Sequence, residues 1–453
     1  MGDTLRFVAF IVTYLPGFAG AALARQLRAL VHRWTYKGPT DTPKVVVVVG
    51  GSFAGYQLMA RLADSLPTGW QAVLVEKNEH YNWSFALPRF SVVPGHEKTA
   101  FMAYARILGK AVQRGVARFV QGEAVSVTPT KEVVLASGEV VKYDVLVVAT
   151  GSAQRPPAKL LGSTHKATAC TELRTLQDRI RLARTVAVVG GGAVGVELVS
   201  DIQTFAKVVA ERHRASNDGK DDSVADKEVT LVHSRTQLLN RFGPRLHEHV
   251  AKVLTDQGIT LELGQRVAIT YKDGEDESAG AGRAGTLTFP DGRTVEYDCV
   301  LLCTGQTPNS GLLQAAFGGA LTNSGEIRVN ANLQVVPDEK TGVALEDVYA
   351  FGDVAATGGP KMARAGWFQS DVIVDNIVAT IQGKAASHKY VPSVVEPSLK
   401  LTLGKDASVM YMDLNDERTK TILMPSGGEA EDMHVKQSWH FMGAKYTDED
   451  DKE

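Results

Sequence analysis

The sequence is poor in cysteine. Its 453 residues include only Cys170, Cys299 and Cys303, and none of these belongs to a CxxC pair. The chain therefore lacks the closely spaced dithiol on which a disulfide reductase depends. Cys299 and Cys303 lie in the apolar run DCVLLCTG, and we interpret them as small buried thiols of a protein from a reducing compartment.

Clustered positive charge is also scarce. The formal net charge is −2, and no long basic run appears after the first forty residues. Binding to nucleic acid requires clustered lysine and arginine, so nucleic acid is not expected as the main partner. A chain of this length is expected to form about three domains, whose cores need neither a disulfide nor a structural metal. We predict no metal site.

The N-terminal segment is unusually apolar. Residues 7–24 contain no charged side chain, although Pro16-Gly17 interrupts this run, which approaches the roughly 20 apolar residues of a spanning helix. Beyond the interruption, apolar residues recur at helical spacing with basic residues between them. The apolar ones are Leu23, Leu27, Leu30, Val31 and Trp34, and the basic ones are Arg25, Arg28, His32 and Arg33. This pattern predicts a basic amphipathic helix, so we expect residues 7–34 to meet a membrane surface.

Other interpretations of this segment stay open. Its arginines and single acid, Asp3, are also typical of a mitochondrial presequence, a secretory signal fits less well, and a plain core helix needs no membrane. Gly2 invites N-myristoylation, but Arg6 stands where that motif requires serine or threonine. We therefore expect a membrane-associated protein at the cytoplasmic face or in mitochondria, with the cytoplasm as the alternative.

An internal duplication organises the rest of the chain. The runs KVVVVVGGSFAGYQLMARL and TVAVVGGGAVGVELVSDI start at Lys44 and Thr185, and each contains a β-branched strand, a glycine turn and a helical pattern. A strand that ends in Thr-Gly follows each of them, at 138–151 and 292–305. This repetition predicts an α/β fold with two Rossmann-like dinucleotide-binding domains, each built on a doubly wound parallel sheet.

The first unit has the features of an FAD-binding domain. Gly50 permits the tight turn and Gly55 permits close packing of the helix on the strand, while Ser52 stands where a middle glycine is usual. The N-terminus of the following helix would hold the pyrophosphate. The second strand ends at Glu76, 21 residues after Gly55, where a carboxylate can accept both ribose hydroxyls. Gly51, Thr150 and Gly151 complete the predicted FAD residues of this unit.

The second unit has the features of an NAD(P)-binding domain. Its turn carries the full glycine pattern of Gly190, Gly192 and Gly195. The second strand ends at His233, where the first copy has an acid that would repel a 2′-phosphate, and Arg235 follows two residues later. We therefore expect NADPH to be accepted as well as NADH. The alternative is that Arg235 is an ordinary solvated loop charge. Gly305 closes this unit.

The chain then returns to the flavin. The segment DVYAFGDVAATGGPKMARAG starts at Asp347, and its strand ends close to Asp353, which can bind a ribitol hydroxyl of FAD. A helix is predicted to begin near Lys361. A helix N-terminus and a lysine beside the flavin ring would stabilise the negative charge of the reduced flavin. The alternative is that Lys361 is an ordinary surface charge.

These motifs resemble those of the pyridine-nucleotide flavoprotein superfamily. The resemblance rests on VVVGGSFAG, YDVLVVATGS, VVGGGAVGVE, VTLVHS, LLCTG and VYAFGDVA…PKMA in this order, and it covers residues 43–453. Within the superfamily the chain is most similar to the apoptosis-inducing-factor-like, mitochondrion-associated group. That group includes the ferroptosis-suppressor NAD(P)H:quinone oxidoreductase and is related to type II NADH dehydrogenases. The chain departs from the group at Ser52, in the unmet myristoylation motif and in its long N-terminal apolar segment.

The resemblance implies a glutathione-reductase-type arrangement with a small C-terminal segment. The implied divisions are a membrane or targeting segment at 1–42, FAD-binding parts at 43–160 and 306–383, an NAD(P)-binding domain at 161–305, and an interface segment at 384–453. It implies that Glu197 helps to bind the nicotinamide, and that Glu197 and Lys361 take part in catalysis. The last segment would cover the flavin and is a candidate for a homodimer or membrane contact.

The expected activity is hydride transfer from NADH or NADPH to FAD, followed by electron transfer to a quinone. One alternative is a different acceptor, such as an electron-transfer protein or a small molecule in biosynthesis. Another is a signalling flavoprotein of the apoptosis-inducing-factor kind, against which the near-neutral charge argues.

Overall fold

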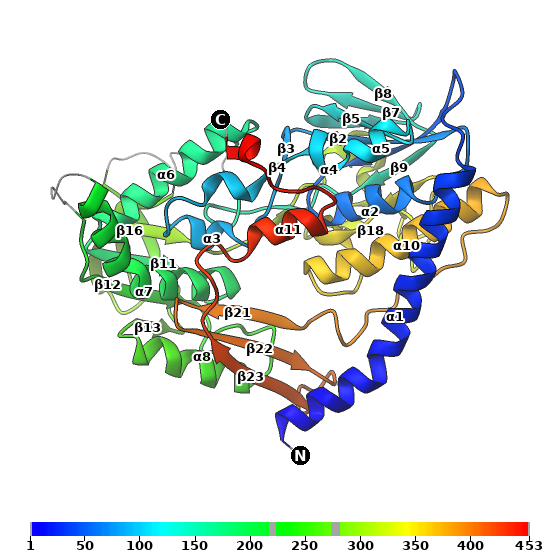
Figure 1. Ribbon diagram of the computed structural model, residues 1–453. Coiled ribbons are helices and arrows are strands. Elements are labelled where there is room, and N and C mark those ends of the chain that lie inside the picture. Colours follow the sequence, from blue (N-terminus) through cyan, green and yellow to red (C-terminus); the bar gives the residue numbers. More distant parts are fainter. Residues whose placement is uncertain (1, 161, 217–222, 273–280, 452–453) are drawn as a thin grey trace.

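The computed structural model describes residues 2–160, 162–216, 223–272 and 281–451. Two α/β bodies lie side by side, a small sheet from the C-terminal segment lies beneath them, and one long helix runs along the edge (Figure 1). The predicted pair of parallel sheets is confirmed, and the two sheets are built from the two sequence repeats.

The first body contains a five-stranded parallel sheet in the order β19-β9-β1-β2-β5. Its strands are β1 (Lys44–Val49), β2 (Trp70–Glu76), β5 (Ala117–Gln121), β9 (Val145–Val148) and β19 (Val348–Ala350). Val46, Val47 and Val48 are fully buried, as expected for a strand that is covered on both faces. Helices α2 (Phe53–Ala63) and α10 (Ala363–Ile381) pack against each other on this body. The edge strand β19 comes from the part of the chain that follows the second body in the sequence.

The second body contains a six-stranded sheet in the order β13-β12-β11-β16-β15-β14. Its parallel strands are β11 (Thr185–Val189), β12 (Glu228–His233), β13 (Thr260–Leu263) and β16 (Thr294–Leu302), and its antiparallel strands are β14 (Ala268–Tyr271) and β15 (Arg283–Thr288). Its helices are α6 (Lys166–Leu182), α7 (Ala193–Ser216) and α8 (Pro244–Asp256).

Shorter elements complete the two bodies. An antiparallel meander consists of β6 (Ala124–Thr128), β7 (Glu132–Leu135) and β8 (Val140–Lys142). Between β2 and β5 lie β3 (His80–Asn82), α3 (Leu87–Phe90), β4 (Phe101–Ala103), α4 (Tyr104–Ile107) and α5 (Gly109–Gln113). The remaining short elements are α9 (Gln314–Phe317), β18 (Ile327–Arg328) and β20 (Ala355–Ala356). Strands β10 (Ser152–Ala153) and β17 (Thr307–Pro308) pair directly after the two Thr-Gly turns and so connect the bodies.

The C-terminal segment joins the two bodies. Strands β21 (Leu399–Leu403), β22 (Ala407–Asp413) and β23 (Thr421–Gly427) form an antiparallel sheet whose buried face packs in the core of the second body. Helix α11 (Val435–Phe441) packs instead in the core of the first body, where the Trp439 indole N–H donates to the carbonyl of Thr99 over 2.8 Å. The suggested homodimer contact of this segment stays a prediction.

The N-terminal segment forms one helix, α1 (Asp3–Thr35). The interruption predicted at Pro16-Gly17 is wrong, because the helix continues through Pro16. Proline removes only one helical hydrogen bond and fixes a φ close to helical, and contacts with the body support α1 on both sides of it. Asp3 pairs with Arg245 before the proline, and Arg25 pairs with Asp371 after it, at 2.8 Å in both cases.

Candidate functional site

The first glycine turn connects β1 to α2 and leaves no room for side chains. Gly50 has a φ of +99°, and a Cβ on it would lie 2.5 Å from the carbonyl oxygen of Ala149 at the end of β9. A Cβ on Gly55 would overlap the carbonyl oxygen of Gly50. Both positions therefore require glycine, and the turn brings backbone N–H groups to the start of α2, where a phosphate can bind.

Glu76 lies beside this turn at the end of β2. Its carboxylate accepts hydrogen bonds from the backbone N–H of Gly51 over 2.7 Å and from that of Asn78 over 3.0 Å. Each carboxylate oxygen can accept more than one hydrogen bond, so Glu76 retains capacity for ribose hydroxyls. Ser52 is the N-cap residue of α2, and its side chain makes no capping hydrogen bond there.

A lysine that the sequence gave no reason to select lies in the same region. Lys159 donates to the carbonyl of Ser152 and is close enough to Asp353 and Glu76 for both to favour its charged form. Burial lowers the pKa of Lys159 against these two acids. Lys159 is a half-buried cation between Glu76, predicted to bind the ribose of FAD, and Asp353, predicted to bind its ribitol. A cation in this place fits the pyrophosphate that joins those two parts. No motif marks this residue, because only the fold brings it there.

Asp353 and the two Thr-Gly turns lie at the junction of the bodies. Asp353 accepts a hydrogen bond from the Ser152 hydroxyl over 3.3 Å. Thr150 donates to the carbonyl of Asn309 over 2.7 Å, across the junction that β10 and β17 form. Gly151 and Gly305 have φ values of +65° and +76°, so both turns use a conformation that favours glycine.

The second glycine turn repeats the geometry of the first. Gly190 has a φ of +129°, and a Cβ there would overlap the carbonyl oxygen of Cys303. A Cβ on Gly195 would overlap the carbonyl oxygen of Gly190. Gly192 faces open space, with no atom within 4 Å of an added Cβ. The turn thus has a tight inner side, which packs on the protein, and an open side toward a ligand.

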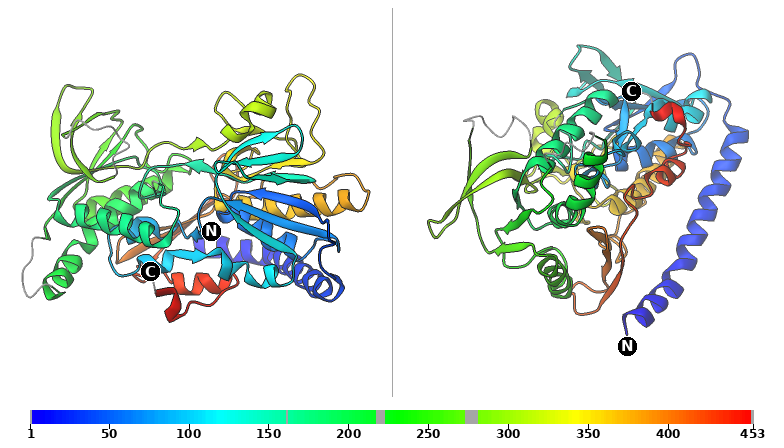
Figure 2. Two further views of the ribbon diagram at one scale, coloured as in Figure 1. Left: turned by 90° about the horizontal axis from the view of Figure 1, so that it is seen from above. Right: turned by 60° about the vertical axis from the view of Figure 1, so that its left-hand side comes forward.

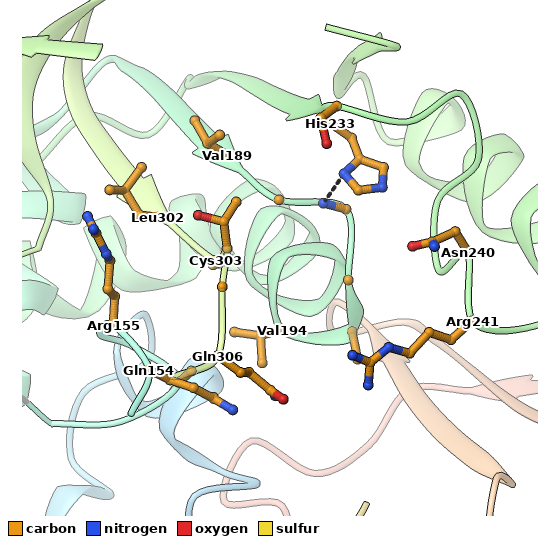
Figure 3. A pocket seen from close by; sticks show the side chains of 18 of the residues that line it. Gln154, Arg155, Val189, Val194, His233, Asn240, Arg241, Leu302, Cys303 and Gln306 are labelled. Carbon is orange, nitrogen blue, oxygen red and sulfur yellow. Dashed lines mark hydrogen bonds between the residues drawn. The ribbon is translucent and has the colours of Figure 1, made fainter. Parts of the chain in front are cut away.

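His233 occupies the position of Glu76 in this second unit. Its Nδ1 accepts a hydrogen bond from the backbone N–H of Gly191 over 3.1 Å (Figure 3). Burial lowers the pKa of His233, and the charge of Arg235 lowers it further, so the ring is neutral at pH 7. With Nδ1 as acceptor, the proton lies on Nε2. The strand end therefore has no negative charge where the first unit has a carboxylate.

A cleft of about 790 Å³ connects this turn with the flavin-binding elements. Gly190 and His233 line one end, and Asp353 and Lys361 line another part. Three arginines that sequence analysis did not select also line it, namely Arg155, Arg241 and Arg266. Arg155 and Arg241 lie on opposite sides of the cleft in Figure 3. Arg235, which was selected, is an exposed residue outside the described lining.

Lys361 lies two residues before α10. Its ammonium group pairs with Glu326 over 2.6 Å and donates to the carbonyl of Ala355. Both Lys361 and Glu326 line the cleft. The lysine is therefore held in a defined position on the wall that it shares with Asp353, rather than extending freely into solvent. Glu326 has no motif of its own and could not be identified from the sequence.

Glu197 lies in α7 and faces the C-terminal sheet. Its carboxylate accepts from the backbone N–H of Thr402 over 3.0 Å and from the Thr402 hydroxyl over 3.1 Å. Burial raises the pKa of Glu197 to about 7, and the nearby Asp201 adds to this effect. Asp201 itself pairs with the buried Arg89 over 2.8 Å. The described lining of the cleft does not include Glu197, so its role in catalysis stays a prediction.

The thiols of Cys299 and Cys303 are in their unreactive, protonated form. Burial raises the pKa of both Cys299 and Cys303 to about 12, so both are protonated at neutral pH. Cys299 is fully buried in β16, and Cys303 follows this strand directly. Among the described residues there is no cluster of three or more histidine, cysteine or acidic side chains that could hold a metal ion.

Two dinucleotide-binding turns whose bodies share one cleft define a flavoprotein oxidoreductase. The family model described as pyridine nucleotide-disulphide oxidoreductase matches residues 44–370, and the chain belongs to this family. It is an FAD-dependent NAD(P)H oxidoreductase, with FAD as cofactor and NADH or NADPH as co-substrate.

Several curated proteins are similar over most of their length. Fe-regulated protein 8 of Mycosarcoma maydis is 34% identical over 82% of this chain and 89% of that protein. Ferroptosis suppressor protein 1 of Taeniopygia guttata is 29% identical over 88% of this chain and 95% of that protein. Apoptosis-inducing factor homolog B of Dictyostelium discoideum is 24% identical over 81% and 88%. The chain thus resembles the group that its motifs indicated.

Solved structures share the fold at low sequence identity. The sulfide:quinone oxidoreductase of Aquifex aeolicus has a TM-score of 0.62 and 16% identity, over 88% of this chain and 90% of that chain. The water-forming NADH oxidase of Lactobacillus brevis has a TM-score of 0.58 and 19% identity, over 83% and 76%. At these identities the comparison establishes the fold alone.

Proposed function

We propose that the protein is a membrane-associated NAD(P)H:quinone oxidoreductase. The overall reaction is NAD(P)H + H⁺ + quinone → NAD(P)⁺ + quinol, which balances two electrons and two protons. Bound FAD supplies the carrier chemistry, since it accepts a hydride and gives up two electrons to a second substrate. The residues of this chain bind and orient the partners and hold charge where it develops.

On the nucleotide side, the open face of the turn at Gly192 receives the pyrophosphate of NAD(P)H at the N-terminus of α7. Arg241 and Arg266 attract the anionic nucleotide, and the neutral His233 does not repel a 2′-phosphate. The cleft then leads toward Asp353 and Lys361, so the nicotinamide reaches the flavin from this direction.

On the flavin side, Glu76, Lys159 and Asp353 bind successive parts of FAD, from the adenosine ribose through the pyrophosphate to the ribitol. Lys361 and the N-terminus of α10 would direct positive charge at the flavin ring, where it would favour reduction of the flavin. The ion pair with Glu326 keeps the lysine in place for that role.

Helix α1 is the observation that carries the choice of a quinone. Most of its large apolar side chains are exposed, among them Val12, Leu23, Leu27 and Trp34. In composition and length it is the one helix among the described residues that could cross a membrane, although this alone is weak evidence. A protein attached to a membrane through residues 7–34 has access to an acceptor dissolved in lipid. The thiols of Cys299 and Cys303 are protonated, so they do not serve as an internal dithiol that accepts the electrons.

An acceptor screen on the purified flavoprotein tests this proposal. We expect NADPH oxidation to be stimulated most by quinones, and less by electron-transfer proteins such as cytochromes or ferredoxins at equal concentration. A higher kcat/KM with a protein acceptor would contradict the proposal and favour the electron-transfer alternative. The sulfide:quinone oxidoreductase among the similar structures is consistent with quinone reduction on this fold, but the assay decides.

A further inference from the structure

Helix α1 has two different faces. The half-buried or buried positions recur along one side and include both charged and aromatic residues. They are Asp3, Arg6, Phe7, Phe10, Ile11, Phe18, Ala22, Arg25, Ala29 and His32. The large apolar side chains that α1 exposes on the other side are mostly Leu and Val, as in Leu5, Val8, Val12, Leu15, Leu23, Leu27 and Leu30. An amphipathic helix on a soluble protein normally shows the reverse arrangement, with its charges toward water.

The charged residues of α1 pair with the protein itself, both on the inner face and, at the exposed Arg28, beside it. Arg25 pairs with Asp371 of α10 over 2.8 Å, and Arg28 pairs with Asp375 of the same helix over 2.9 Å. His32 is buried, and its Nε2 lies 2.7 Å from the carbonyl of Leu66. Together with the Asp3–Arg245 pair near the start, these contacts fix α1 to the body near both of its ends. The helix runs along the edge of the molecule (Figure 2, right).

Arg33, the other arginine in the C-terminal half of α1, also lies close to an acid. Arg33 lies 3.8 Å from Asp64, which Arg114 contacts as well. Exposed pairs of this kind are individually weak, but they leave each of these arginines beside an acid of the protein. The helix therefore offers a surface little attraction through its charges and much through its exposed apolar side chains.

The outer face forms a straight stripe. Apolar residues recur at intervals of 11, in the sets Leu5, Pro16, Leu27; Val8, Ala19, Leu30; and Val12, Leu23, Trp34. This spacing is close to three turns of an ordinary helix, so the stripe stays on one side from end to end. A left-handed coiled coil with a second copy needs a spacing of seven instead. From Leu5, the seven-residue spacing leads to Gln26 and Arg33, which are poor contacts for such a partner.

A straight apolar stripe on a helix that is fixed along a protein edge fits a flat apolar surface. A spanning orientation would break the pairs of Arg25 and Arg28 and place these charges near or within the hydrocarbon. A second copy in a left-handed coiled coil does not match the spacing. A bilayer surface preserves every contact of the inner face and covers the whole outer face.

We propose that α1 lies in the plane of a bilayer, with its outer stripe inserted among the lipids and its inner face still bound to the body. This inference deepens the proposed membrane association and rests on it. It differs from the expectation of a basic helix that is attracted to anionic lipid, because here the arginines are paired with acids of the protein. Binding therefore depends on buried apolar area and only slightly on lipid charge.

Paired substitutions on the outer stripe test the orientation. Leu23 and Leu27 are 57% and 55% exposed, so Leu23→Glu/Leu27→Glu leaves the core intact. The control is Val343→Glu, at an exposed apolar residue outside α1. In sedimentation with phosphatidylcholine vesicles, we expect the double variant to partition at least about tenfold more weakly than wild type, and the control to match wild type. NADPH oxidation with a water-soluble quinone should be equal in all three proteins.

Lipid charge and depth provide the second measurement. Binding to pure phosphatidylcholine and to vesicles with one-third phosphatidylserine should agree within about threefold at low and high salt. Brominated lipid should quench the fluorescence of Trp34, which is 84% exposed, with Trp34→Phe identifying its share. Binding only to anionic vesicles with loss in salt, or unchanged binding of the double variant, would overturn the inference.

The same experiments separate this inference from the proposed function. If the double variant loses membrane binding while all proteins fail to reduce quinones, the orientation stands and the acceptor is wrong. If quinone reduction holds but the double variant binds vesicles normally, the orientation is wrong and the acceptor stands. A fall in oligomeric state of the double variant, seen by light scattering, would show that a second copy occupies the stripe and overturn the inference.

Discussion

The two glycine turns of this protein have the same backbone and different chemistry. In the first, the N–H of Gly51 donates to the carboxylate of Glu76 over 2.7 Å. In the second, the N–H of Gly191 donates to the imidazole of His233 over 3.1 Å. In both, the last glycine of the turn, Gly55 or Gly195, lies directly against the carbonyl that opens the turn.

The difference extends into the following helices. Two residues after the last glycine, the first unit has Gln57 where the second has Glu197. Four residues further along the helix, the first unit has Arg61 where the second has Asp201. Arg61 pairs with Asp371 over 2.6 Å, whereas Asp201 pairs with Arg89 over 2.8 Å. The glycines of each turn thus fix the backbone of the dinucleotide-binding unit. The neighbouring side chains differ between the two units and can determine which nucleotide binds.

The largest expected effect comes from breaking either turn. Gly55→Ala and Gly195→Ala each place a Cβ against backbone that cannot move aside. We expect Gly55→Ala to yield protein without bound flavin. Gly195→Ala should retain flavin, but its reduction by NADPH should slow by about a hundredfold or more. Flavin absorbance per protein and stopped-flow reduction measure the two effects.

Gly192→Ala is the matched control for these variants, because its Cβ meets no atom within 4 Å. We expect normal flavin content and a normal melting temperature for it. Loss of flavin in Gly195→Ala would mean that the two turns are not separable, and the comparison between them would fail.

The next effect concerns the cation in the first unit. Lys159→Met removes the half-buried ammonium between Glu76 and Asp353 but keeps a similar volume. A charge-assisted hydrogen bond is worth roughly 1.5–3 kcal/mol, so FAD should bind about 10- to 100-fold more weakly. Titration of the apoprotein with FAD, followed by flavin fluorescence, measures the dissociation constant. Lys77→Met, at a neighbouring surface lysine, should leave it unchanged.

Exchanging the strand-end residues sharpens the comparison. Wild type should accept NADPH and NADH within about tenfold in kcat/KM, because neutral His233 does not repel a 2′-phosphate. His233→Glu gives the second unit the acid of the first, and we expect kcat/KM for NADPH to fall about a hundredfold while that for NADH changes less than threefold. A strong NADH preference in wild type that His233→Glu leaves unchanged would contradict this account.

The smallest effect is a pH dependence of stability. The pKa of Glu197 is raised to about 7 in the folded protein, above its unfolded value, mainly by burial. The folded state thus binds the proton more tightly, so this contribution to stability is complete below about pH 4.5 and is lost as the pH rises through 7. Glu197→Gln, which supplies the residue of the first unit, should melt a few degrees above wild type at pH 8 and equal it at about pH 4. A constant difference across this range would contradict the raised pKa.

The sequence allowed the two sheets, both turns and the strand-end residues to be predicted, because short-range patterns dictate them. Gly50 and Gly190 must be glycine for reasons contained in a few neighbouring residues. Lys159, Arg241 and Glu326 could not be predicted, since each reaches the site only through the tertiary fold. Which face of α1 lies against the protein could not be predicted from the sequence either. Its polar face is turned inward by Asp371 and Asp375, which lie more than 300 residues away in the chain.

The central claim is that this flavoprotein takes two electrons from NAD(P)H and passes them to a quinone. Anaerobic double-mixing stopped flow tests it most directly. One equivalent of NADPH should bleach the flavin absorbance, and one equivalent of a short-chain quinone, added next, should restore it with release of one quinol per flavin. Flavin that stays reduced in the presence of the quinone, but is reoxidised by a protein acceptor, would contradict the claim.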